Sequence, residues 1–214
     1  MNRREVLSRV ALIMGGTIIG AEAFLSGCKT TPAKEGLFSV DDISLLDEIG
    51  ETILPTTASS PGAKAAQIGN FMKTIVTDCY PEEDQQTFTD GITQLQEAAK
   101  KKYDKSFMDL TPEQRTEFLT ALDKEAKDHA KEVSERASKM TDADRHKRTE
   151  DQHRGTYKKD PKDGPHYFGM MKQLTVWGYF TSKPGATQAL RYTAVPGSYQ
   201  GCIPYKKGDK AWAT

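Results

Sequence analysis

The stretch IGNFMKTIVTDC, residues 68–79, decides the fold, because it holds the clearest periodic pattern in the chain. Its apolar residues fall at i, i+3, i+4, i+7, i+8 and i+11, namely Ile68, Phe71, Met72, Ile75, Val76 and Cys79. Apolar residues at this spacing form one stripe of a helix, and such a stripe packs against a core. The stretch therefore predicts an amphipathic helix.

Helix signals flank this stretch on both sides. Ser39 and Asp42 form a capping-box-like start, and Pro55 stops the helix that begins there. Pro81 opens a third helix, and TPEQ at 111–114 opens a fourth with a cap, a first-turn proline and a capping-box glutamine. The expected core residues of these helices are Ile43, Leu46, Ile49, Ile53, Phe88, Ile92, Leu95, Ala99, Phe118, Leu119 and Leu122. The sequence predicts a mainly α fold with a single helical domain over residues 39–214.

A charged arm follows at residues 124–163, where 12 basic and 10 acidic side chains accompany only three large apolar residues. A segment of this composition has little apolar surface to bury. We expect either a solvated helix that extends past the core or a partly disordered segment. Docking of a partner is the alternative.

After Gly164 the chain becomes aromatic and holds half of its Trp, Tyr and Phe residues. Residues 166–180 predict a helix with one apolar stripe. The stripe residues are Phe168, Met171, Leu174 and Gly178. Beyond Thr181, closely spaced prolines and glycines predict an irregular C-terminal segment. Its aromatic residues either pack over the core or are offered to a partner.

The N-terminus, MNRREVLSRVALIMGGTIIGAEAFLSGC, resembles an export signal. It begins with basic residues, and the apolar stretch at residues 10–21 is too short to span a bilayer. The small-residue run before Cys28 is what a lipoprotein signal peptidase cleaves. We therefore expect a signal peptide at residues 1–27, an acylated Cys28, and a lipidated tether at residues 28–38 on the periplasmic side of a bacterial membrane.

The pair Arg3-Arg4 favours the twin-arginine route, which exports folded proteins. An ordinary signal for unfolded export is the alternative. An N-terminal helix with an incidental Cys28 is the alternative to the lipoprotein interpretation as a whole.

The composition excludes some functions. Without residues 1–27 the chain has 27 basic and 28 acidic groups, so it lacks the basic excess expected of a nucleic-acid-binding protein. Cys79 and Cys202 remain beside Cys28. Outside the cytoplasm they can form a disulfide, which would contribute about 3–5 kcal/mol by closing a long loop. Two separate buried thiols are the alternative.

Catalytic and cofactor motifs are absent from the sequence. It has no G-x-G-x-x-G and no C-x-x-C-H, so it predicts neither a dinucleotide fold nor attached haem. Its four histidines are His129, His146, His153 and His166, and none pairs with a Cys or another His at metal-ligand spacing. A weak metal site of His146 and His153 with Asp144 and Asp151 is the alternative. We therefore predict no catalytic residue, no metal and no cofactor in this chain.

Several segments resemble the gluconate 2-dehydrogenase subunit 3 family. They are DDISLLDEIGETILPTT at 41–57, SPGA at 60–63, WGYFTS at 177–182, GATQALRY at 185–192, VPG at 195–197 and GCIPY at 201–205. The resemblance implies a small, non-catalytic subunit. Its partner in the family is a large FAD-dependent dehydrogenase of the glucose–methanol–choline type, which oxidises a sugar or sugar acid and passes electrons to a cytochrome c or a quinone.

We therefore expect a subunit that escorts, stabilises and membrane-tethers a periplasmic flavin dehydrogenase. Trp177, Tyr192 and Trp212 are the interface candidates. The alternative is a carbohydrate-binding lipoprotein that works alone, with the aromatic residues of the tail stacking on sugar rings.

Overall fold

The computed structural model describes residues 36–156, 160–195, 197–198, 201–204 and 206–213. The chain falls into two compact units, residues 1–35 and 36–214, of which only the second is described. Arg3, Arg4, Cys28 and nearly all of the tether therefore lie outside the described residues.

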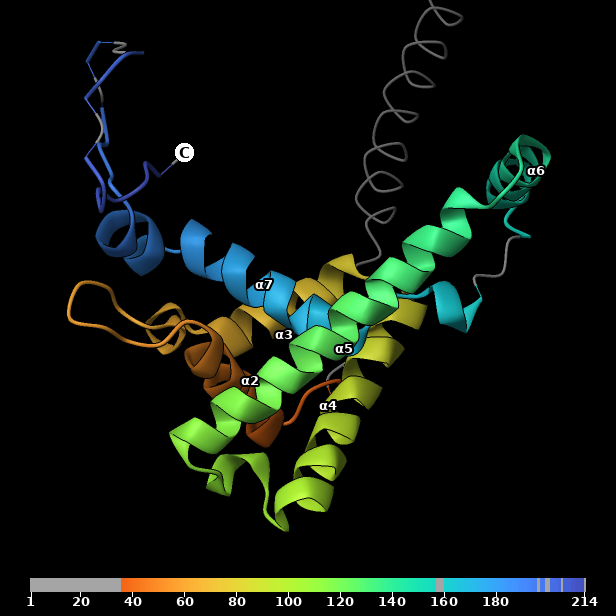
Figure 1. Ribbon diagram of the computed structural model, residues 1–214, viewed down its shortest axis with the longest axis horizontal. Coiled ribbons are helices and arrows are strands. Elements are labelled where there is room, and N and C mark those ends of the chain that lie inside the picture. Colours follow the sequence, from red (N-terminus) through yellow and green to blue (C-terminus); the bar gives the residue numbers. More distant parts are fainter. Residues whose placement is uncertain (1–35, 157–159, 196, 199–200, 205, 214) are drawn as a thin grey trace, which may run out of the picture. The chain divides into compact units, whose positions relative to one another are not determined.

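The second unit is built from helices (Figure 1). The α-helices are α2 Val40–Ile53, α3 Ile68–Cys79, α4 Glu82–Tyr103, α5 Pro112–Ser138, α6 Asp142–His153 and α7 Tyr167–Thr181. Four short elements connect or follow them: η1 Ala63–Ala66, η2 Phe107–Asp109, η3 Pro161–Asp163 and the π-helical turn η4 Gly185–Ala189. No strand forms among the described residues, so the predicted mainly α fold is confirmed.

Local sequence sets the starts of the helices. Ser39 accepts a hydrogen bond from the Asp42 N–H, and the Asp42 carboxylate accepts one from the Ser39 N–H. The same reciprocal box joins Thr111 and Gln114 at the start of α5. Each box satisfies backbone donors that a helix start leaves without partners. Both predicted starts are confirmed, and a third box, not predicted, begins α6 at Thr141.

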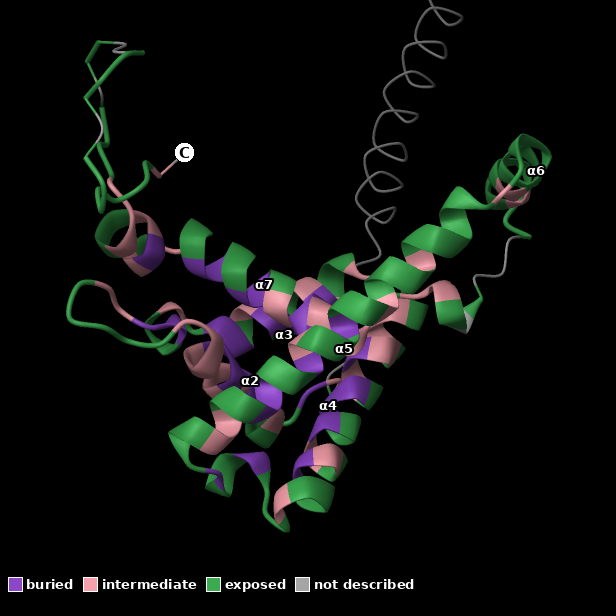
Figure 2. Cartoon of the chain, in the orientation of Figure 1, coloured by how far each residue is buried: buried purple, intermediate pink, exposed green. Residues whose placement is uncertain are grey.

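The core lies where α7 meets α2, α3, α4 and α5 (Figure 2). Close packing depends on glycines at two crossings. A Cβ on Gly69 of α3 would come within 2.3 Å of the Ile43 carbonyl oxygen on α2, and a Cβ on Gly91 of α4 would come within 2.2 Å of the Tyr167 Cβ on α7. The helices therefore approach one another more closely there than any side chain would allow.

The predicted core is largely confirmed. The stripes expected on α4, α5 and α7 are all buried, as are Leu46 and Ile49 of α2. Ile43 and Ile53 pack against the core but are only half-buried. Leu45, which the predicted stripe of α2 did not include, is buried instead. Cys79 does not belong to the core: it is exposed at the last position of α3, so the apolar face ends before it.

The charged arm is mostly solvated helix. α5 continues twelve residues past Ala126, its last buried residue, and α6 buries none of its residues. Figure 2 shows both stretches as mainly exposed. The expectation of a solvated helix thus holds for residues 127–138 and 142–153. Among the described residues, no helix is both long and apolar enough to cross a membrane.

Candidate partner-binding surface

In its C-terminal half, residues 174–181, helix α7 is apolar nearly all round, whereas Lys172 and Gln173 make the preceding turn polar. One face is buried in the core through Met171, Leu174 and Tyr179. The opposite face carries Val176, Trp177 and Phe180, which remain exposed although they are large and apolar. A stretch of helix that is apolar on both faces is normally buried on both. We refer to Val176, Trp177 and Phe180 as the exposed stripe of α7, and its lack of cover makes it the first candidate for a partner contact.

Trp177 is held in place although half of it is exposed. Its ring meets the Phe71 ring of α3 edge-on, with 5.4 Å between the centroids and 82° between the planes. The neighbouring Gly178 leaves room for that arrangement, because a Cβ there would come within 2.5 Å of the Phe71 ring. An exposed tryptophan with a fixed ring is typical of the residues that dominate binding energy at protein interfaces.

The loop between α2 and η1 anchors the end of α7. The Tyr179 hydroxyl lies 2.7 Å from the Ser60 Oγ and donates a short hydrogen bond to the Pro61 carbonyl oxygen. The Glu51 carboxylate organises this loop from inside by accepting hydrogen bonds from the Thr56 and Lys64 N–H groups. Burial raises the pKa of Glu51, but these hydrogen bonds outweigh it, and the net pKa is lowered.

The C-terminal segment is irregular, as predicted, and its described residues are mostly exposed rather than packed over the core, but it is fastened to the domain. Arg191 and Trp212 form an isolated parallel bridge, and the guanidinium lies 4.9 Å from the centre of the Trp212 ring. Lys210 donates hydrogen bonds to the carbonyl oxygens of Ser59, at 2.9 Å, and of Gln188.

The three interface candidates from the sequence are all exposed. Trp177 is 50% exposed, Tyr192 54% and Trp212 48%. Trp177 lies on α7, whereas Tyr192 and Trp212 lie at the two ends of the irregular segment. Their exposure fits a contact with a partner, and their role at an interface stays a prediction.

The structure brings together two histidines that sequence spacing does not connect. His166 caps α7 by accepting a hydrogen bond at Nδ1 from the Phe168 N–H, at 3.2 Å. The His129 ring of α5 lies 5.8 Å away, centroid to centroid, and Tyr167 stacks on His166 at 4.6 Å. Burial lowers the pKa of His166, and the Glu125 carboxylate, 3.8 Å from Nε2, only partly offsets this effect. Burial also raises the pKa of Tyr167 to about 12.

No catalytic or metal-binding arrangement follows from these contacts. An open groove of about 460 Å³ lies beside the two histidines, and small or apolar residues such as Ala126, Val133 and Met170 form much of its lining. Among the described residues, no group of three or more His, Cys, Asp or Glu side chains is placed to hold a metal ion.

The two cysteines correct the sequence-based expectations. Cys79 and Cys202 are both free and both exposed, so the structure contains neither a disulfide between them nor two buried thiols. Cys79 ends α3, while Cys202 lies in the irregular segment between Arg191 and Trp212. The loop-closure stabilisation considered for this pair is therefore absent from the structure.

Comparison with known families decides the assignment. Residues 41–197, well over half of the chain, match Gluconate 2-dehydrogenase subunit 3. The chain belongs to the gluconate 2-dehydrogenase subunit 3 family. Comparisons with curated proteins and with solved structures find no match. Family membership implies a non-catalytic accessory subunit that associates with a larger dehydrogenase complex. The matched range includes α7 and its exposed stripe.

Proposed function

We propose that this chain escorts, stabilises and membrane-tethers a periplasmic FAD-dependent sugar or sugar-acid dehydrogenase of the glucose–methanol–choline type. The observation that carries the proposal is the uncovered apolar stripe of α7 in a chain whose family belongs to a dehydrogenase complex. Val176, Trp177 and Phe180 are the residues that the catalytic subunit would cover. The bound FAD belongs to that subunit, with electrons leaving to a cytochrome c or a quinone.

The N-terminal sequence supports the escort and tether roles. Arg3-Arg4 suits export of a folded partner that already holds its flavin, and a lipid on Cys28 would anchor the complex. Cys28→Ser is expected to release the complex from the membrane without dissociating it. Arg3→Lys with Arg4→Lys is expected to leave both subunits in the cytoplasm. Fractionation followed by immunoblotting measures both outcomes.

The central test is a mild-detergent pull-down of the tagged full chain from its native membranes. We expect a stoichiometric large subunit whose absorbance spectrum is that of a flavoprotein. Recovery of the chain alone would contradict the proposal and favour the stand-alone sugar-binding lipoprotein, which sugar titration of the same sample then tests.

A matched pair of variants locates the contact. Val176→Lys places a charge on the stripe, while Val40→Lys makes the same change at the 78%-exposed first residue of α2. Both side chains are exposed, so both variants should fold. Only Val176→Lys is expected to lose the large subunit. Equal retention by the two variants would show that the stripe is not the contact.

A further inference from the structure

The irregular C-terminal segment is a closed loop rather than a free tail. The Arg191 N–H donates to the Ala211 carbonyl oxygen and the Ala213 N–H donates to the Arg191 carbonyl oxygen, both at 2.8 Å. Arg191 also lies 3.5 Å from the Asp209 carboxylate, Nη2 to Oδ2, besides stacking over Trp212. We call residues 192–211 the tail loop, and the contacts of Arg191 with residues 209–213 the latch.

The tail loop exposes apolar side chains that the domain does not use. All of its described residues are exposed, and Val195 is 82% exposed. Tyr192 and Ile203 are also among the large exposed apolar residues. Loops of this length without secondary structure are uncommon inside compact domains and are usually functional. The latch holds the ends of this loop together in the absence of any partner.

The loop lies in the basic part of an otherwise acidic domain. Residues 39–181 contain 26 acidic and 20 basic side chains, whereas residues 182–214 contain five basic and one acidic. Two of these five, Lys206 and Lys207, are exposed next to the turn at Gly208. Such an asymmetry of charge orients an acidic partner toward the basic segment and speeds its association.

We propose that the tail loop is a docking loop, and that it binds an acidic surface with an apolar pocket on the large dehydrogenase subunit. The inference rests on the proposed function for the identity of the partner. The loop continues the exposed stripe of α7 along the chain, because only η4 and its flanking residues separate Phe180 from Arg191. One partner can therefore cover both surfaces.

The latch lowers the entropic cost of ordering the tail loop when the large subunit binds. An open segment of this length would have to be ordered at the moment of binding, which costs conformational entropy for each residue fixed. Closing the ends beforehand removes part of that cost. Arg191 and Trp212 act as positioning residues for the loop, and the lysines and apolar side chains make the contact.

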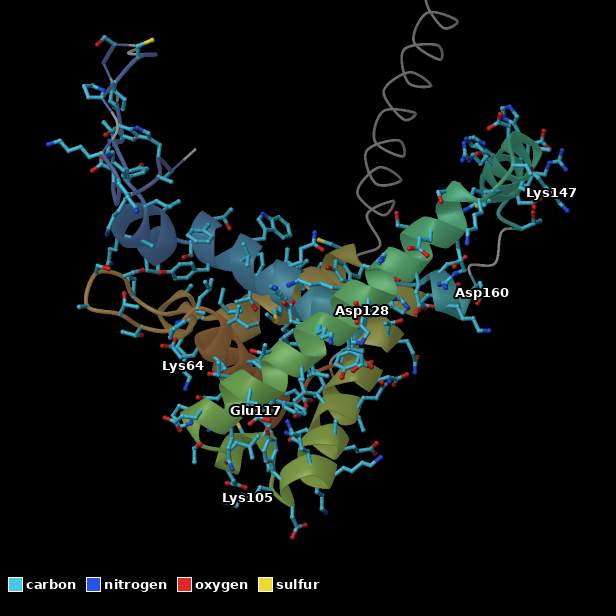
Figure 3. All side chains as sticks on the ribbon, in the orientation of Figure 1. Lys64, Lys105, Glu117, Asp128, Lys147 and Asp160 are labelled. Carbon is cyan, nitrogen blue, oxygen red and sulfur yellow. The ribbon has the colours of Figure 1, made fainter. Side chains whose placement is uncertain are left out.

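Charge reversal tests the contact in the native complex. The full-length variant Lys206→Glu with Lys207→Glu is compared with Lys105→Glu with Lys147→Glu, which changes the charge equally at two exposed lysines away from the tail (Figure 3). Large subunit retained in the pull-down is measured over a series of NaCl concentrations. We expect retention by the wild-type chain to fall with salt. Retention by the tail variant should be about tenfold lower at low salt, and this difference should narrow as salt screens the charges.

The latch is tested by Arg191→Ala and by Arg191→Lys. The first should lower retention about as much as the charge reversal, and the second should restore most of it, because lysine keeps the charge over the Trp212 ring. Circular dichroism and thermal unfolding of each variant should match the wild-type chain, since none of these side chains is buried.

The outcomes separate the two proposals. If the wild-type chain retrieves no flavoprotein, the proposed function is wrong, and the inference with it. If the wild-type chain retrieves it and both tail variants retrieve it equally well, the proposed function stands and the docking loop is refuted. The docking loop is also refuted if the tail variants keep the large subunit and instead lose binding to vesicles that contain phosphatidylglycerol, because the loop would then face lipid.

Discussion

Gly69→Ala and Gly169→Ala are the same chemical change and should have opposite effects on stability. Gly69 lies in the first turn of α3, where its N–H donates to the Asp47 carboxylate at 2.8 Å. Its Cα faces the Ile43 carbonyl oxygen of α2 across a crossing that leaves no space for a side chain. Gly169 lies in the first turn of α7, where the nearest atom to an added Cβ is that of Ala126, at 4.0 Å.

The magnitudes follow from these distances. An alanine at Gly69 must move from 2.3 Å to an ordinary contact of 3.4 Å, so α2 and α3 must separate by about 1 Å. Overpacking of this kind lowers the free energy of unfolding by about 1–3 kcal/mol, and the better helix propensity of alanine offsets up to about 1 kcal/mol of that loss. The net destabilisation is about 1–2 kcal/mol. At Gly169 only the propensity gain remains, about 0.5–1 kcal/mol of stabilisation.

Thermal unfolding followed by circular dichroism measures both effects. For a chain of this size each kcal/mol moves the Tm by about 2–4 °C. Gly69→Ala should therefore lower the Tm by about 2–8 °C, and Gly169→Ala should raise it by about 1–4 °C. A Gly69→Ala variant as stable as the wild-type chain would refute the close crossing of α2 and α3.

Three further predictions concern single polar groups. Arg115→Ala should destabilise the chain by about 2 kcal/mol, because it removes one of the two ion-pair partners of Glu48, leaving Lys64, and the hydrogen bonds to the Phe107 and Met108 carbonyl oxygens. The exposed Arg145→Ala should change stability by less than about 0.5 kcal/mol, and urea unfolding compares the two variants. Tyr179→Phe should cost about 1 kcal/mol by removing a hydroxyl with two hydrogen-bond partners, and proteolysis should then cut the loop at residues 54–62 faster. The folded pKa of His166 is lowered, so the unfolded chain binds its proton more readily, and stability should fall as pH drops below about 6.5 and level off below the folded pKa. His166→Asn keeps a capping group without titrating, so it should flatten the pH profile of the Tm in that window.

The helices and most of the core could be predicted from the sequence because the relevant signals are local. The caps at Ser39 and Thr111 act within three residues, and the apolar stripes repeat every turn. These signals gave the starts of α2 and α5. Burial was less predictable, because it depends on where a partner helix ends: Cys79 fits the stripe of α3 by spacing and is nevertheless exposed.

The contacts between distant segments could not be predicted. The ion pair of Glu48 with Arg115 joins residues 67 positions apart, and nothing in either local sequence indicates it. The His129–His166 pair depends in the same way on the crossing of α5 with the start of α7. At the candidate interface, Trp177 was predicted from composition alone. Its fixed ring and the uncovered stripe around it could not be predicted, because both depend on how α7 packs between four other helices.

Helix α5 is continuous over 27 residues, but only its first half is packed against the core. Amides near Phe118 and Leu122 can exchange their hydrogens with solvent only when the whole domain opens, whereas those after Ala126 need only the local unwinding of a solvated helix. One unbroken helix therefore spans the full range of opening free energies in the domain. A hydrogen-exchange profile along α5 would mark, residue by residue, where tertiary packing stops supporting secondary structure.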